Sequence, residues 1–85
     1  MKVMNLADCQ RFSSEKMKKN NLFQTERFFC DVYCFEPGQE QQGHVHSDQD
    51  KVYLVLEGQG TFQVGVEKQV LEAGQATLAP AGEEH

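Results

Sequence analysis

The sequence has little positive charge and no long apolar run. It holds 8 lysine and arginine residues against 13 aspartate and glutamate residues, so its net charge is −5. This acidic balance argues against a nucleic-acid-binding surface. No segment approaches the roughly 20 apolar residues of a membrane-spanning helix, and residues 1–5 are too short and polar for a signal peptide. We therefore expect neither a nucleic-acid nor a membrane partner.

Cysteine is also scarce, with Cys9, Cys30 and Cys34 as the only three. An odd count in a chain without an export signal indicates reduced thiols and a cytoplasmic location. Cys30 and Cys34 would share one strand face with Cα atoms ~13 Å apart, which is too far for a disulfide. We expect them to be buried as small apolar side chains.

At 85 residues the chain is expected to form one domain with a small core. Residues 1–21 read as a short strand (1–6) and a polar loop, and residues 22–85 as a β domain. In that part, short runs of strand-forming residues alternate with turn residues, including a hairpin turn at 58–60, which is typical of an antiparallel sandwich or barrel. The predicted strands are 22–25, 27–36, 44–46, 51–57, 61–66, 69–71 and 75–79.

Histidine occurs only three times, always in a glycine-punctuated segment. His44 and His46 are two residues apart, and because side chains alternate along a strand, both point to one face. His85 follows a second turn, Pro80-Ala81-Gly82. Three imidazoles from two strand–turn segments are what a metal site inside a barrel would need.

The two segments resemble the motifs of the cupin family. The first family motif is a Gly, five residues, His-x-His, three or four residues, Glu, six residues and Gly. The second is a Gly, five residues, Pro-x-Gly, two residues, His, three residues and Asn. The matching positions are Gly38, His44, His46 and Gly58 for the first motif, and Gly74, Pro80, Gly82 and His85 for the second.

The resemblance implies a small antiparallel β-barrel or jelly roll that binds a divalent transition metal (Zn, Fe, Ni, Mn or Cu) through His44, His46 and His85. Three histidines leave coordination positions open, which is the style of a catalytic rather than a structural site. The family's Asn and last strands would follow His85, so the barrel is expected to be incomplete at its C-terminal end.

One position departs from the family pattern, because Lys51 stands where the motif has its metal-binding Glu. An ammonium group cannot bind a metal and would repel it. Three interpretations stay open: Lys51 turns out toward Asp48 or Asp50, it lies near the metal as a base or substrate anchor, or the site is metal-free and Lys51 holds an anionic ligand.

The remaining pocket wall is predicted from strand alternation and the resemblance, with Lys51, Tyr53, Val55, Phe62 and Leu78 facing the interior. Two functions follow: a metal-dependent enzyme acting on a small molecule, with its catalytic residues unassigned, or a non-catalytic small-ligand binding or sensing module without metal. Fold alone does not choose between them.

The opposite face of the strand at 51–57 carries only Val52, Leu54 and Leu56. A purely aliphatic outer face needs a cover. We expect a homodimer through this sheet, with the N-terminal segment as the alternative cover.

Overall fold

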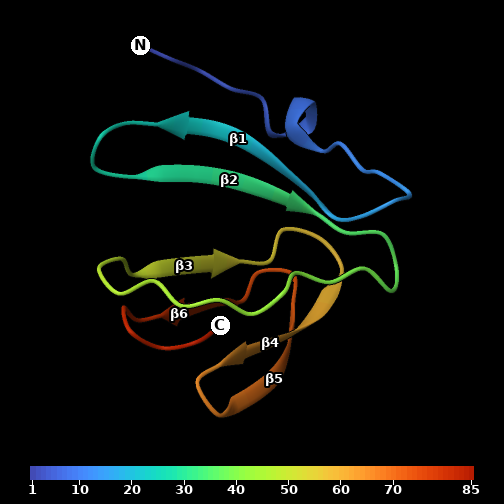
Figure 1. The fold of residues 1–85 in the computed structure, drawn as a ribbon. Helices are drawn as coiled ribbons and strands as arrows, with labels where there is room; N and C mark the ends of the chain where they lie inside the picture. Colours follow the sequence, from blue (N-terminus) through green and yellow to red (C-terminus); the bar gives the residue numbers. More distant parts are fainter. The chain divides into compact units, whose positions relative to one another are not determined.

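Strands make up most of the regular structure in the computed structural model, which describes residues 1–85. Every strand pair is antiparallel, and the pairs β1–β2, β3–β6 and β4–β5 form three two-stranded sheets. The predicted all-β antiparallel class is confirmed. The elements are η1 (Leu6–Cys9, a 3-10 helix), β1 (Lys18–Gln24), β2 (Phe29–Cys34), β3 (Lys51–Leu54), β4 (Gln59–Val64), β5 (Glu67–Glu72) and β6 (Ala76–Ala79) (Figure 1).

The helical residues are far too few to provide a long apolar segment of the kind that crosses a membrane. The chain divides into two compact units, Met1–Gln41 and Gln42–His85. The predicted boundary after residue 21 falls within β1, because that strand begins at Lys18 rather than at Leu22.

The first unit is built on the β1–β2 hairpin. Residues 18–21 have weak strand propensity, but their pairing with β2 draws them into the strand, since sheet context outweighs propensity. Residues 1–5 find no such partner and form no strand, and η1 follows them. The core consists of the buried side chains of Cys9, Val32 and Cys34, with Leu22 packed against them.

All three cysteines are free thiols. Cys34 is buried as predicted, and its thiol donates to the Cys9 carbonyl at 3.6 Å. Cys30, by contrast, is exposed. It pairs with Phe23 next to an irregularity in the β1–β2 register and is not part of the small core.

In the second unit, β3 pairs with β6 so that Tyr53 lies opposite Thr77 and Val52 opposite Leu78. The two faces of β3 differ as the alternation predicted. Lys51 and Tyr53 are half-buried, whereas Val52 is 70% exposed. Val55, the next residue on the half-buried face, is buried.

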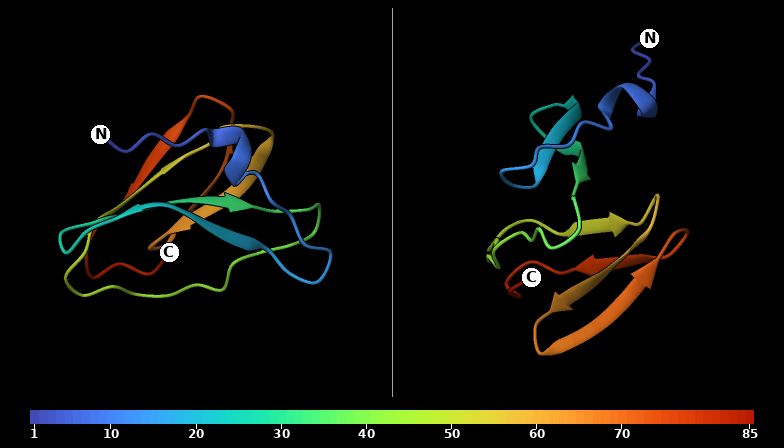
Figure 2. Two further views of the ribbon diagram at one scale, coloured as in Figure 1. Left: turned by 90° about the horizontal axis from the view of Figure 1, so that it is seen from above. Right: turned by 90° about the vertical axis from the view of Figure 1, so that its right-hand side faces the viewer.

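A hairpin turn was predicted at 58–60, but the strands on either side of it, β3 and β4, do not pair with each other. Residues around Val55 pair instead with the chain before β6, with the Val55 amide donating to the Gln75 carbonyl at 2.9 Å. The hairpin of this unit is β4–β5, which turns at Gly65 (Figure 2). Gly65 has a φ of 60°, and a Cβ there would lie 2.9 Å from a Glu83 carboxylate oxygen, so the turn favours glycine.

Candidate metal centre

The two histidines of the first motif lie on a short extended segment rather than a full strand. Val45 forms an isolated antiparallel bridge with Glu84, and no longer ladder is present around it. The alternation still holds, since His44 and His46 are half-buried and Val45, between them, is 55% exposed. The two imidazoles therefore share one side of the chain, as predicted.

Backbone pairing brings the third histidine to the first two. The His44 amide donates to the His85 carbonyl at 2.9 Å, and the His85 amide donates to the His44 carbonyl at 3.0 Å. Residues that exchange both hydrogen bonds lie directly opposite each other in an antiparallel pair. The C-terminal segment, drawn in red, therefore runs beside the segment that carries His44 and His46 (Figure 2).

The three imidazoles form one cluster. Their ring centroids lie 4.3 Å apart for His44 and His85, 4.8 Å for His44 and His46, and 5.6 Å for His46 and His85. One nitrogen from each ring lies within 4.8 Å of the other two, and no carboxylate or thiolate joins the set. Nitrogens bound to one ion at ~2.1 Å lie about 3 Å apart, so small ring rotations would bring them to binding distance.

Two of the rings are oriented by backbone carbonyls. The Nδ1 atom of His44 lies 3.2 Å from the Gln42 carbonyl, and that of His85 lies 3.2 Å from the Glu83 carbonyl. Because a carbonyl only accepts, Nδ1 carries the proton in each neutral ring and Nε2 presents its lone pair. Metal-binding histidines are oriented by the same type of contact.

The Nε2 atom of His85 is buried and has no hydrogen-bond partner. A buried nitrogen without a partner is costly and calls for an explanation, such as an ion. The His85 ring lies 4.3 Å from the His44 ring and 5.6 Å from the His46 ring, measured between centroids, and imidazole nitrogen is a good ligand for Zn, Cu, Fe and Ni. The residues present therefore fit a divalent transition metal.

The surroundings of His46 lower its pKa and so favour its neutral form. Burial lowers the pKa of His46 below 6.5, and positive charge on His44, Lys51 and His85 lowers it further, while Asp48 acts in the opposite direction. A neutral imidazole is the form that binds metal. The surroundings of His46 therefore favour its role as a ligand even without an ion.

Lys51 lies on the half-buried face of β3, and its ammonium nitrogen is 5.2 Å from the centroid of the Tyr53 ring, over that ring. Of the two loop carboxylates considered as its partners, Asp50 accepts a hydrogen bond from the Ala81 amide at 2.9 Å. Asp50 therefore fixes the turn that leads to His85.

Most of the predicted pocket wall lies on one side of the second unit. The Tyr53 ring is 5.9 Å from the His85 ring and 5.6 Å from the half-buried Phe62 ring, and Val55 is buried on the same face of β3. Leu78 is a correction, since it pairs with Val52 on the outer face and is 51% exposed. The half-buried Thr77 stands across from Tyr53 in its place.

Reasoning from the sequence missed Thr77, and it missed the contact between Asp50 and the Ala81 amide. The alternation in residues 75–79 separates Leu78 from Thr77, but only the pairing partner of β6 determines which of them faces inward. The sequence suggests Asp50 only as a partner for Lys51, because a side-chain contact with an amide 31 positions away leaves no local signal.

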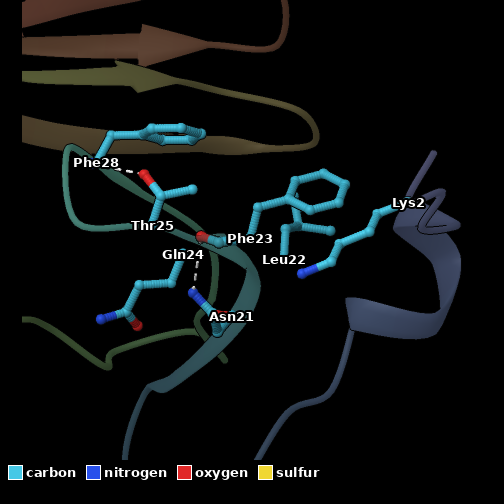
Figure 3. Close-up of a pocket in the computed structure, with 7 residues that line it drawn as sticks. All are labelled: Lys2, Asn21, Leu22, Phe23, Gln24, Thr25 and Phe28. Carbon is cyan, nitrogen blue, oxygen red and sulfur yellow. Dashed lines mark hydrogen bonds between the residues drawn. The ribbon is translucent and has the colours of Figure 1, made fainter.

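A hollow lies in the first unit and holds none of the predicted site residues. It is an open pocket of about 460 Å³ that combines one lysine and polar side chains with apolar ones (Figure 3). The side-chain amide of Asn21, at its wall, is already bonded to Asp31 and to the Phe23 carbonyl. The lining residues are Lys2, Asn21, Leu22, Phe23, Gln24, Thr25 and Phe28.

The antiparallel β fold and the cluster of His44, His46 and His85 are the features that the cupin motifs predicted. Residues 31–85 match the model of the cupin domain family, so the chain belongs to the cupin domain family, which confirms the resemblance.

Among solved structures, the chain is similar to the TT1209 protein from Thermus thermophilus, at 44% sequence identity and a TM-score of 0.95. The match covers 99% of this chain and 80% of the Thermus chain. None of the curated proteins compared with the chain matches it.

Proposed function

We propose that this cupin domain binds one divalent transition metal ion through His44, His46 and His85. The buried Nε2 of His85, which has no hydrogen-bond partner and belongs to a cluster of three imidazoles, is the observation that carries the proposal. Three neutral imidazoles leave coordination positions for water or a small molecule, as in catalytic sites. A metal-dependent enzyme acting on a small molecule is therefore the function that this geometry supports best.

When bound, the metal would act as a Lewis acid or activate water. The chain's own contributions are separate from that chemistry. The carbonyls of Gln42 and Glu83 orient two of the imidazoles. The aromatic ring of Tyr53 lies next to His85, and the Phe62 ring packs against Tyr53, so both add apolar surface on this side of the unit.

Elemental analysis of the purified protein tests the proposal. We expect about one transition metal ion per chain and almost none in His44→Ala. Gln42→Ala is the matched control, because His44 contacts only the backbone carbonyl of that residue. Unchanged metal content in His44→Ala, with folding verified by circular dichroism, would show that the ligands are assigned wrongly.

A second candidate function is a metal-free module that binds a small anionic molecule. It is favoured by Lys51, whose half-buried side chain occupies the side of β3 where the family pattern places a metal-binding Glu. This function predicts a protein purified without metal that still binds a ligand in a Lys51-dependent way.

A further inference from the structure

The turn between β4 and β5 contacts the C-terminal segment that carries His85. The Gly65 amide, in that turn, donates a hydrogen bond to the Glu84 carbonyl at 2.7 Å. The amide and carbonyl of His85 are instead bonded to His44, and Val45 forms a bridge with Glu84. Because neighbouring residues of an extended segment direct their backbone groups to opposite sides, residues 83–85 are held from two sides.

The turn leaves no room for a side chain at position 65. Gly65 has a φ of 60°, in the left-handed region that favours glycine. A Cβ there would lie 2.9 Å from a carboxylate oxygen of Glu83, so that one of the two residues would have to shift. The Gly65 carbonyl accepts a hydrogen bond from the side-chain amide of Gln63 at 3.2 Å, which further holds the turn.

The position of Glu83 acts directly on the third imidazole. The Glu83 carbonyl lies 3.2 Å from Nδ1 of His85 and orients that ring, whose Nε2 is buried without a hydrogen-bond partner. Movement of residues 83–84 would therefore turn or displace the imidazole. Groups that orient a metal ligand from behind affect metal affinity almost as much as the ligands do.

We propose that Gly65 is a positioning residue for the metal centre: through its amide and its lack of a side chain, the β4–β5 turn fixes residues 83–85 and thereby the His85 imidazole. The inference rests on the proposed function, because a metal ion is what this imidazole would bind. Coupling between two sites is reciprocal. A metal ion that holds His85 in place should therefore also hold the Gly65 amide against the Glu84 carbonyl.

Amide hydrogen exchange followed by NMR, with and without zinc, tests this coupling, and elemental analysis measures the zinc bound. Zinc should slow exchange of the Gly65 amide by roughly fivefold or more, the lower end of typical coupling between sites. The Gly74 amide is the internal reference and should slow less, because it donates to the Val55 carbonyl in another turn of the same unit. Bound zinc without this added protection at Gly65 would overturn the inference and leave the proposed function intact.

Gly65→Ala and its matched control Gly74→Ala test the same role by substitution. Gly74 also has a positive φ, 88°, but a Cβ there would meet no atom within 4 Å. Both substitutions strain a left-handed turn, and only Gly65→Ala acts on residues 83–85. Gly65→Ala should weaken zinc binding about tenfold, the lower end for groups that orient a ligand, and Gly74→Ala by less than about twofold. Equal losses in the two variants would contradict the positioning role.

The placement of His85 is also measurable without metal. In metal-free protein, Gly65→Ala should shift the imidazole NMR signals of His85, whereas Gly74→Ala should leave them near their wild-type positions. His85 signals that Gly65→Ala does not move would overturn the inference whether or not the protein binds zinc. A wild type that takes up no zinc would contradict the proposed function, and the His85 signals would still decide whether Gly65 positions the imidazole.

Discussion

Single nitrogen atoms decide the chemistry of this site. The carbonyls of Gln42 and Glu83 hold the Nδ1 protons of His44 and His85, so Nε2 is the available donor on both rings. The pKa of His46 is lowered by burial and by nearby positive charge, including that of Lys51. After burial and His44, Lys51 thus contributes to the lowered pKa of His46, and its charge also weakens the attraction of the site for a cation.

The first prediction concerns the titration of His46 in metal-free protein. Its pKa should lie below 6.5, and Lys51→Met should raise it, although partial burial keeps it depressed. Histidine NMR signals followed against pH measure this directly. A His46 pKa above 6.5, or one that Lys51→Met leaves unchanged, would contradict the described environment.

The same shift has a consequence for stability. Because the His46 pKa is lower in the folded chain than in the unfolded chain, the unfolded chain binds more protons, and the free energy of unfolding should decrease as the pH falls through 6.5. Metal affinity should fall over the same range, since protonated imidazole does not bind metal. Urea unfolding at pH 7.5 and pH 5.5 checks the sign.

Another prediction concerns Lys51, which stands where the family motif has a Glu. Lys51→Glu should tighten metal binding about tenfold or more, the scale seen when groups around a metal site are altered, because an anion replaces a cation near the histidines. Lys68→Glu on β5 adds the same charge elsewhere and should change affinity little. Weaker metal binding in Lys51→Glu would mean that the lysine itself supports the site.

At the scale of elements, the site depends on backbone pairing between distant segments. The His44–His85 pair exchanges two hydrogen bonds, and the Gly82 amide donates to the His46 carbonyl at 2.7 Å. The turn between β6 and His85 is anchored by the Asp50 side chain through the Ala81 amide. These contacts fix where the C-terminal imidazole lies.

Asp50→Ala tests this anchoring. Loss of the hydrogen bond to Ala81 should lower the free energy of unfolding by about 1 kcal/mol and weaken metal binding by loosening the turn before His85. Glu67→Ala, which removes an exposed carboxylate on β5, is the control in urea unfolding and cobalt titration. Equal effects of the two substitutions would argue against the anchoring role.

The sequence was informative wherever the deciding interaction is local or carried by the family motifs. Alternation alone placed His44 and His46 on one side and separated Lys51 and Tyr53 from Val52. The family spacing indicated that His85 would join them. Leu78 was misplaced because its orientation depends on which strand pairs with β6, and that partner is far away in the sequence.

In the N-terminal part, too, the sequence alone did not identify which segments pair. Residues 18–21 look like a loop by composition, yet they pair with β2 from Lys18 onward. The strand expected at residues 1–6 has the residue types but no partner. Strand formation is a property of pairs of segments, and single-segment propensity does not identify the pair.

At the scale of the whole molecule, the outer face of the β3–β6 sheet is apolar. Val52 is 70% exposed, Leu54 58%, Leu56 42% and Leu78 51%. We predict that two chains associate through this face, since exposed aliphatic patches mark interaction surfaces. Leu54→Lys should shift the mass measured by analytical ultracentrifugation toward the monomer, while Val66→Lys, at an exposed valine in the β4–β5 turn, should not. A wild-type monomer would contradict the dimer.

X-ray absorption spectroscopy of the metal-loaded protein tests the central claim most directly, because it counts the imidazoles around the ion. We expect three imidazole nitrogens at about 2.0–2.1 Å from zinc in the wild type and two in His85→Ala. A wild-type spectrum with two or fewer imidazoles, or one that His85→Ala leaves unchanged, would contradict the convergence of His44, His46 and His85 on one metal ion.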